Sequence, residues 1–417
     1  MDYYVLPSEI SGSVSAPPSK SMTQRAIAAA LLAAGESIIT NPSDCDDSLA
    51  AINIVTALGA DVIHKPGLLR ITGGSGKIRE RLLNCGESGL AIRMFSPVAS
   101  LNVEEIILTG TGSLVKRPMS IIEDALTQFG VKCKSKGGFL PLTIQGPLRG
   151  GHCEIDGSLS SQLLTGLLMA LPVAERDSVI IVNNLKSKPY VDMTLQVLKS
   201  FGIRTVRSDY SRFEIPGNQK YKAKKIEIEG DWSGGAFLLV AGAINGDIKV
   251  EGLRADSLQS DKAILNVLDS AGVRTTILED SVTVRKSQLK PFFFDATESP
   301  DLFPPLVTLA AFCNGKSKIR GVSRLIHKES NRAKALIGEF GKIGIRVETD
   351  DDNMIVTGGS VKGGEVSSHG DHRIAMAAAV AALGGAGKIL IKDSGCVAKS
   401  YPLFFEHLRR LGTMIYE

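Results

Sequence analysis

The sequence has no long uninterrupted apolar segment. Its longest apolar stretches, such as residues 163–174 and 375–383, fall well short of the roughly 20 residues that a membrane-spanning helix needs. The pattern of an integral membrane protein is therefore missing. Residues 1–4 also lack a basic region followed by an apolar one, so we expect no secretory leader.

Cysteine pairs and metal-ligand motifs are missing as well. The six cysteines are dispersed and contain no C-x-x-C pair, which indicates a reduced, cytoplasmic protein. The six histidines form no H-E-x-x-H motif or other tight cluster, so we predict no metal site. The chain also shows no glycine-rich nucleotide fingerprint.

A large excess of charge of either sign is absent too. Lys and Arg number 48 against 44 Asp and Glu, which leaves a net charge of +4. This charge is too small and too evenly spread to indicate binding to nucleic acid or to a membrane surface. Any cationic site must therefore be assembled locally.

What the sequence does contain is a repeated pattern. A glycine closes an amphipathic helical segment and opens an apolar strand at six places, separated by 68 to 72 residues. We interpret each glycine as the left-handed cap that ends a helix, and the pattern as six copies of one supersecondary unit. The six glycines are Gly59, Gly130, Gly202, Gly272, Gly344 and Gly412.

The length of the chain favours two domains. Its 417 residues exceed the ~250–300 at which a single hydrophobic core stops growing. Each copy has room for two helices and several strands, so grouping in compact domains is favoured over stacking in a rod. Three units per domain is the simplest division.

Polar clusters stand where the predicted helices begin. Residues 17–25 provide the first example: two prolines and capping hydroxyls lead into an Ala- and Leu-rich helix whose first turn carries Lys20 and Arg25. Further cations in equivalent places are Arg117, Lys188, Lys328, Arg332, Arg373 and Lys399. Hydroxyl donors there are Ser21, Ser160, Ser161 and Ser187.

This placement predicts an anion site. A helix start has unpaired N–H groups and a partial positive charge, so it binds phosphate or carboxylate well. Arg suits two-point contact with carboxylate or phosphate oxygens, whereas Lys acts as a mobile point charge. A solvated helix end is the simpler interpretation for any one of these cations, but the whole set favours a polyanionic ligand.

Eight motifs in order along the whole chain carry a family resemblance. They are Lys20-Ser21 with Arg25, Lys116-Arg117-Pro118-Met119, Ser160-Ser161-Gln162, Ser187-Lys188-Pro189-Tyr190, Glu229-Gly230-Asp231, Lys328-Glu329 with Arg332, Asp371-His372-Arg373 and Ala398-Lys399. Together they resemble the 5-enolpyruvylshikimate-3-phosphate synthases, the 3-phosphoshikimate 1-carboxyvinyltransferases among the enolpyruvyl transferases.

The resemblance implies an α/β fold of two domains, each built from three βαβαββ units. The N-terminal three-unit domain would span residues 19–227, and the C-terminal one residues 1–18 plus 228–417. A double hinge would join them, with the active site in the interdomain cleft. These expectations agree with the six glycine intervals.

The reaction that the resemblance implies is transfer of the enolpyruvyl group of phosphoenolpyruvate to the 5-hydroxyl of shikimate 3-phosphate, with release of phosphate. It belongs to the shikimate pathway of aromatic amino-acid biosynthesis. No cofactor is implied. The expected partners are the two small-molecule substrates, with no nucleic acid and no membrane, and we expect a cytoplasmic monomer.

Site residues follow from the matching motifs. Shikimate 3-phosphate would contact Lys20, Ser21, Arg25, Ser160, Ser161, Gln162, Ser187, Asp301 and Lys328. Phosphoenolpyruvate would contact Lys20, Gly89, Arg117, Gln162, Arg332, Arg373 and Lys399. The catalytic proton carriers would be Lys20, Asp301 and Glu329, because addition and elimination each need a group that gives or takes a proton. Which carboxylate serves which carbon stays open.

One departure from the family pattern is visible. The usual Asn-Ala-Gly-Thr before the helix Arg is Glu87-Ser88-Gly89-Leu90 before Arg93 here. The departure concerns the detail of the phosphoenolpyruvate pocket, including sensitivity to glyphosate, and not the reaction.

Two alternative functions account for part of this pattern. Enolpyruvyl transfer to a nucleotide sugar calls for a Cys in the loop before the Arg-Pro pair, and residues 111–115 contain none. A noncatalytic anion-binding module explains the cations but not Asp301 and Glu329 among them, because carboxylates weaken anion binding unless they carry protons.

Overall fold

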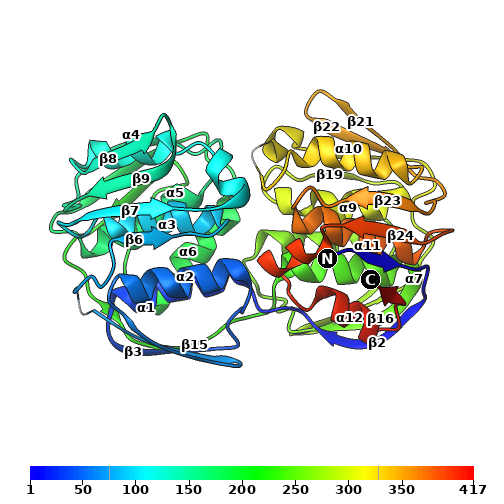
Figure 1. Cartoon of the computed structure of the whole chain (residues 1–417), viewed down its shortest axis with the longest axis horizontal. Helices are drawn as coiled ribbons and strands as arrows, with labels where there is room; N and C mark the ends of the chain where they lie inside the picture. The colour runs from blue at the N-terminus through cyan, green and yellow to red at the C-terminus, as the bar shows by residue number, and fades with distance from the viewer. Residues whose placement is uncertain (75, 327) are drawn as a thin grey trace. The chain divides into compact units, whose positions relative to one another are not determined.

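The computed structural model describes residues 1–74, 76–326 and 328–417. The chain forms two compact units (Figure 1). We call Pro18–Ile228 the N-terminal domain, and Met1–Pro17 together with Glu229–Glu417 the C-terminal domain.

The N-terminal domain contains three small sheets. Its helices are α1 (Lys20–Leu32), α2 (Asp46–Ala57), α3 (Gly89–Ala99), α4 (Ser120–Gln128), α5 (Gln162–Ala170) and α6 (Lys188–Ser200). Its strands are β3 (Ala33–Thr40), β4 (Asp61–Lys65), β5 (Leu68–Gly73), β6 (Leu82–Asn84), β7 (Glu105–Thr109), β8 (Lys132–Lys136), β9 (Phe139–Gln145), β10 (His152–Asp156), β11 (Ser178–Asn183), β12 (Val206–Arg207), β13 (Arg212–Ile215), β14 (Tyr221–Lys222) and β15 (Lys225–Glu227).

The C-terminal domain repeats the plan. Its helices are α7 (Trp232–Asn245), α8 (Ile264–Ser270), α9 (Phe303–Ala311), α10 (Arg332–Lys342), α11 (His372–Leu383) and α12 (Phe404–Arg410). Its strands are β1 (Tyr3–Val5), β2 (Ile10–Ser15), β16 (Gly246–Glu251), β17 (Arg274–Ile277), β18 (Ser281–Arg285), β19 (Phe293–Asp295), β20 (Lys316–Arg320), β21 (Arg346–Asp350), β22 (Asn353–Thr357), β23 (Gly364–Ser367), β24 (Ile389–Lys392) and β25 (Ile415–Tyr416).

Each sheet has the same topology. In the order β6-β7-β9-β8, the first two strands are parallel and are connected through α3, whereas β9 runs antiparallel to both β7 and β8. The sheets β10-β11-β13-β12 and β19-β20-β22-β21 repeat this arrangement. The predicted βαβαββ unit is therefore confirmed.

Three units take strands from distant parts of the sequence. β1 lies between β24 and β25 and completes the last unit, and β2 pairs in parallel with β16 to open the fourth. β14 and β15 pair in parallel with β3 and open the first unit, although they follow the third in sequence. The chain thus passes twice between the domains, after Pro17 and after Ile228.

Buried helices form the centre of each domain. In the C-terminal domain α7, α9 and α11 pack against one another (Figure 1). Every residue of α9 and of α11 is buried, as expected of helices that are apolar on all sides. The other helix of each unit, such as α10, keeps one exposed face. In the N-terminal domain α3 and α5 pack in the same way.

The six glycine caps are confirmed. Each of the six has a positive φ, between +77° and +109°, and each follows the second helix of a unit. The residue after each glycine donates its N–H to a carbonyl five residues earlier, as Ile345 does to Phe340 at 2.9 Å. This is the bond of a Schellman motif, which requires the left-handed conformation that glycine adopts without strain.

Three cations that were predicted at helix starts do not lie there. Lys328 precedes α10 by four residues, and Arg117 and Lys399 lie at 3₁₀ helices. Arg117 follows the 3₁₀ helix η1 (Gly112–Lys116) and precedes α4 by three residues, and Lys399 is the last residue of the 3₁₀ helix η6 (Ser394–Lys399). Both segments are too short to give a helical pattern in the sequence. Their cations therefore do not gain from a helix N-terminus of their own.

Three remaining features bear on the class of protein. All six cysteines are free thiols. Within residues 1–74, 76–326 and 328–417, no group of three or more His, Cys, Asp or Glu side chains is arranged to hold a metal ion. Over the same ranges, no helix combines the length and apolarity needed to cross a membrane.

Candidate active site

In the N-terminal domain, polar side chains link the starts of three helices. Ser19 caps α1 by accepting from the Met22 N–H, and Ser88 caps α3 by accepting from the Ala91 N–H at 3.2 Å. The side chains of Gln24 and Ser88 lie 3.4 Å apart, which joins α1 to α3. The N-terminal end of α3 therefore lies beside the N-terminal half of α1.

The same linkage extends to α5. Arg93 of α3 donates to Oε1 of Gln162, the first residue of α5, at 3.3 Å. The Ser160 hydroxyl accepts from the Gln162 N–H at 3.1 Å, and Ser161 is buried at the N-cap position. The predicted residues Ser160, Ser161 and Gln162 therefore lie at the start of α5, which Arg93 joins to α3.

Arg25 is a buried cation surrounded by neutral acceptors. Only 1% of the residue is exposed. Its guanidinium donates to the Thr194 hydroxyl at 2.9 Å, the Ser21 carbonyl at 2.8 Å, the Tyr190 carbonyl at 3.2 Å and the Thr165 hydroxyl at 3.4 Å. Burial lowers the pKa of Arg25 to about 10. A buried positive charge held by uncharged oxygens retains its attraction for an anion.

Lys20 and Ser187 complete this set. Lys20 opens α1, and its Nζ lies 2.9 Å from Oδ2 of Asp47 on α2. Ser187 precedes α6 with φ +58° and is buried. A non-glycine residue in the left-handed region is strained, and such residues cluster at functional sites.

Arg117 lies over Gly89, the first residue of α3. A Cβ at position 89 would stand 2.4 Å from Nη1 of Arg117 and 3.1 Å from Nη1 of Arg93. Only glycine therefore leaves room for the Arg117 guanidinium in this position. Gly89 and Arg117, two of the four residues of this domain that were predicted to contact phosphoenolpyruvate, are thus in close contact with each other.

Glu87, the first residue of the departure, holds the loop that carries Arg117. Its carboxylate accepts from the Ser113 N–H at 2.8 Å and lies against Gly112, where no Cβ would fit. Ser88 caps α3, and Leu90 packs in the hydrophobic core. The altered tetrapeptide therefore keeps Gly89 at the helix start and adds an anchor for η1.

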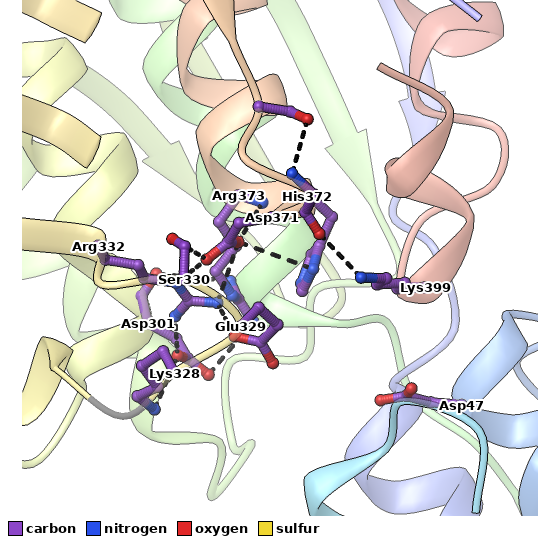
Figure 2. Close-up of polar contacts among 12 residues, drawn as sticks. Asp47, Asp301, Lys328, Glu329, Ser330, Arg332, Asp371, His372, Arg373 and Lys399 are labelled. Carbon is purple, nitrogen blue, oxygen red and sulfur yellow. Dashed lines mark hydrogen bonds and ion pairs between the residues drawn. The ribbon is translucent and has the colours of Figure 1, made fainter. Parts of the chain in front are cut away.

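In the C-terminal domain, an ion-pair network is centred on Arg332 (Figure 2). This residue opens α10 and is 1% exposed. Its guanidinium donates to Asp371 at 2.8 Å, to Asp301 at 2.7 Å and to Glu329 at 2.5 Å. Three carboxylates around one guanidinium stabilise its charged form, so the pKa of Arg332 is raised despite the burial that opposes it.

Asp301 is the carboxylate that the most cations share. Lys328 Nζ lies 3.2 Å from its Oδ1, and Arg373 Nη2 lies 3.3 Å from its Oδ2. Burial raises the pKa of Asp301, but Arg373, Lys328 and Arg332 together outweigh burial and hold it well below the usual range. Asp301 is therefore ionised at neutral pH.

Lys328 experiences the opposite balance. Burial lowers its pKa, and although the Asp301 charge acts against this, the net shift is downward. Lys399 lies at the edge of the network, where its Nζ donates to the Gly370 carbonyl at 2.8 Å (Figure 2). The C-terminal domain thus brings Asp301, Lys328, Glu329, Arg332 and Arg373 into one network, with Lys399 beside it.

Three carboxyl groups at these clusters were given no role from the sequence, although Asp371 belongs to one of the eight motifs. Asp47 pairs with Lys20, and Asp371 caps α11 by accepting from the Arg373 N–H at 3.0 Å while binding Arg332. Asp261 is buried and accepts from the Ser233 hydroxyl. Burial and then the nearby Asp301 charge raise the pKa of Asp261 to about 6. Asp47 and Asp371 do stand at helix starts, but no sequence pattern identifies their partners.

Comparison with known proteins identifies the family. The family model described as EPSP synthase (3-phosphoshikimate 1-carboxyvinyltransferase) matches residues 6–408. The chain belongs to the EPSP synthase family. The 3-phosphoshikimate 1-carboxyvinyltransferase of Clostridium kluyveri is 40% identical over 99% of this chain and 97% of its own length. That of Methanocorpusculum labreanum is 37% identical over the whole of both chains.

A solved EPSP synthase structure from Acinetobacter baumannii has the same fold. It covers 100% of both chains at 26% identity with a TM-score of 0.84. The expected fold class and enzyme class are therefore confirmed. The expected EPSP synthase reaction, enolpyruvyl transfer from phosphoenolpyruvate to shikimate 3-phosphate in aromatic amino-acid biosynthesis, is confirmed with the family.

Proposed function

We propose that the two domains divide the two substrates of the EPSP synthase reaction between them. The N-terminal domain provides most contacts to shikimate 3-phosphate, through Arg25, Lys20, Gln162 and the surrounding hydroxyls. Asp301 and Lys328 add contacts to it from the C-terminal domain. The C-terminal domain holds phosphoenolpyruvate through Arg332, Arg373 and Lys399, and its carboxylates carry protons. Lys20, Gly89, Arg117 and Gln162 add contacts to phosphoenolpyruvate from the N-terminal domain.

The observation that carries this proposal is the difference in how Arg25 and Arg332 are neutralised. Arg25 contacts neutral oxygens and is ready for an anion such as a phosphate. Arg332 is already paired with three carboxylates, so an anionic substrate must compete with them. Binding of an anion to Arg332 therefore changes the charge around the three carboxylates. A carboxylate that transfers protons needs such a change in its proton affinity.

Asp301 illustrates the consequence. Its pKa is low because Arg373, Lys328 and Arg332 attract its charge against the effect of burial. An anion that neutralises Arg332 and Arg373 weakens this attraction and raises the proton affinity of Asp301. Substrate binding would thereby convert a fixed counter-ion into a group that can accept a proton from the attacking hydroxyl.

The pair Arg25→Met and Arg373→Met tests the division of substrates. Each change keeps an unbranched apolar side chain but removes a cation. We expect Arg25→Met to raise KM for shikimate 3-phosphate by roughly 10²-fold and to change KM for phosphoenolpyruvate little, with the reverse pattern for Arg373→Met. If both variants weaken the same substrate, the proposed division is wrong.

We also propose the partners, the oligomeric state and the location of the enzyme. The partners are the two small-molecule substrates, and catalysis proceeds in a cytoplasmic monomer without a cofactor. Size-exclusion chromatography with light scattering that gave a stable dimer would contradict the monomer.

A further inference from the structure

Glu339 is a buried carboxylate outside the candidate active site. It lies on α10, two turns after Arg332, and only 5% of its side chain is exposed. A buried carboxylate destabilises a fold unless hydrogen bonds and cations compensate for the lost hydration. Glu339 was not predicted to contact either substrate, so its burial needs an explanation other than direct catalysis.

Three donors compensate this carboxylate. Lys342 approaches both oxygens at 2.9 and 2.8 Å, the Ser367 N–H donates to Oε2 at 2.8 Å, and Nε2 of His369 donates to Oε1 at 2.8 Å. Although burial raises the pKa of Glu339, Lys342, Ser367 and His369 outweigh it, and the net pKa is lowered. Glu339 is therefore an ionised anchor for the segment that contains two of its donors.

That segment, residues 367–370, is strained. His369 has φ +53° and is followed by Gly370 with φ +67°. A histidine in the left-handed region persists only where its surroundings hold it there. Hydroxyls of Ser367 and Ser368 also accept from the N–H groups of His369 and Gly370, each at 3.1 Å.

The C-terminal end of the strained segment reaches the candidate active site at two points. The Gly370 carbonyl accepts from Lys399 Nζ at 2.8 Å. The next residue, Asp371, caps α11 and accepts from Nε of Arg332 at 2.8 Å. A movement of this segment therefore moves the partners of two cations at once (Figure 2).

We propose that Glu339 is a positioning residue for the phosphoenolpyruvate cations. By fixing the backbone of residues 367–370 through Ser367 and His369, it places the Gly370 carbonyl that holds Lys399 and the Asp371 carboxylate that holds Arg332. This inference rests on the proposed function, because it uses the assignment of Lys399 and Arg332 to phosphoenolpyruvate.

The test is the steady-state kinetics of Glu339→Gln. The amide keeps the size of the side chain but has only one acceptor oxygen. It can accept a hydrogen bond from Ser367 or from His369 but not from both, because its NH₂ group would face the other donor. We expect KM for phosphoenolpyruvate to rise roughly 10-fold, with KM for shikimate 3-phosphate changed less than about 2-fold. A purely structural role would lower the thermal midpoint and leave the ratio of the two KM values unchanged.

Two further variants separate the segment from the ion pair. Lys342→Gln removes the half-exposed partner of Glu339 and leaves both contacts to the segment, so we expect normal KM values. His369→Asn keeps a residue that tolerates positive φ and removes one contact, so a rise of about 3-fold in KM for phosphoenolpyruvate is expected. Because His369 is 45% exposed along its side chain, this variant tests the inference even if Glu339→Gln does not fold.

The outcomes distinguish the two proposals. Wild-type protein that does not turn over the two substrates would refute the proposed function. Normal wild-type turnover with an unchanged KM ratio in Glu339→Gln and His369→Asn would overturn the role of Glu339 alone. A loss in Lys342→Gln equal to that in Glu339→Gln would also overturn it, because the ion pair and not the segment would then be responsible.

Discussion

Arg25 and Arg332 are both almost fully buried, and the charge of their partners separates their roles. The oxygens that contact Arg25 are uncharged, so they do not neutralise its positive charge. Asp301, Glu329 and Asp371, in contrast, neutralise the charge of Arg332. Burial strengthens both kinds of interaction, because charges attract one another more strongly in a medium of low dielectric constant. Arg25 is therefore suited to bind a substrate anion directly. Arg332 is suited to exchange its carboxylate partners for a substrate anion.

Glu329→Gln and Asp301→Asn test the proton transfers. An amide keeps the shape and much of the hydrogen bonding but cannot exchange a proton at neutral pH. We expect kcat to fall by roughly 10²-fold or more in each variant, with smaller changes in either KM. Glu348→Gln serves as a control, since that carboxylate pairs with the exposed Arg346 at 2.7 Å. Near-normal kcat with raised KM would make the two carboxylates binding residues instead.

Gly89→Ala tests the position of Arg117. The added methyl group would stand 2.4 Å from the Arg117 guanidinium, so this side chain has to move. We expect KM for phosphoenolpyruvate to rise by about 10-fold while that for shikimate 3-phosphate stays within about 2-fold. Normal phosphoenolpyruvate binding with loss of shikimate 3-phosphate binding would show that Gly89 contacts shikimate 3-phosphate instead.

The raised pKa of Asp261 leads us to expect that the stability of the folded protein depends on pH. Its pKa is raised from 3.8 to about 6 in the folded protein, so the folded state binds more protons than the unfolded one between these values. Its contribution to stability is therefore lost as pH rises from about 4 to about 6. Asp261→Asn cannot ionise, so relative to wild type it should gain on the order of 1–3 kcal/mol between pH 4 and pH 8.

Urea unfolding followed by tryptophan fluorescence measures this gain. Trp232, the one tryptophan of the chain, is buried in the C-terminal domain, so its emission reports the domain that contains Asp261. The difference in unfolding free energy between variant and wild type should grow with pH. A difference that does not change with pH would show that Asp261 titrates normally.

At the scale of elements, local rules predicted the helices well. The motif at residues 17–25 was expected to open a helix, and α1 begins within it at Lys20. The six glycines end their helices as predicted. These features depend on residues a few positions apart, which the sequence displays directly. The short 3₁₀ helices η1 and η6 leave no such pattern. Arg117 and Lys399 lie at the C-terminal ends of these helices, whereas both were predicted at helix N-termini.

Two glycines of one helix test the cap directly. Gly344 ends α10 with φ +87°, whereas Gly338 lies on the exposed face of the same helix with no atom within 4 Å of an added Cβ. Gly344→Ala should destabilise the C-terminal domain by about 1 kcal/mol, and Gly338→Ala should stabilise it by about 0.5–1 kcal/mol. Trp232 fluorescence in urea compares them, and equal effects would contradict the assigned cap.

At the scale of the molecule, the partnerships between distant residues were the part that the sequence could not supply. The insertion of β1 between β24 and β25 joins the two ends of the chain. The pairing of Lys20 with Asp47 and of Arg332 with Asp371 joins different helices. Such contacts depend on how the units pack, which residue spacing does not encode. The order of the motifs along the chain, in contrast, pointed to the family.

The division of residues between two domains leads to a requirement for both substrates. Arg25 and the hydroxyls around it belong to one domain, whereas Asp301, Glu329 and Arg332 belong to the other. If each domain supplies groups for one substrate, neither substrate alone provides everything that the reaction needs. Phosphate should then leave phosphoenolpyruvate only as the enolpyruvyl group is transferred.

The most direct measurement is phosphate release by the purified protein, with the carbon product quantified in the same samples. With phosphoenolpyruvate and shikimate 3-phosphate together, we expect phosphate and enolpyruvyl product to form in equal amounts, and with either substrate alone we expect neither. Phosphate released from phosphoenolpyruvate in the absence of shikimate 3-phosphate, or no release with both present, would contradict enolpyruvyl transfer by this protein.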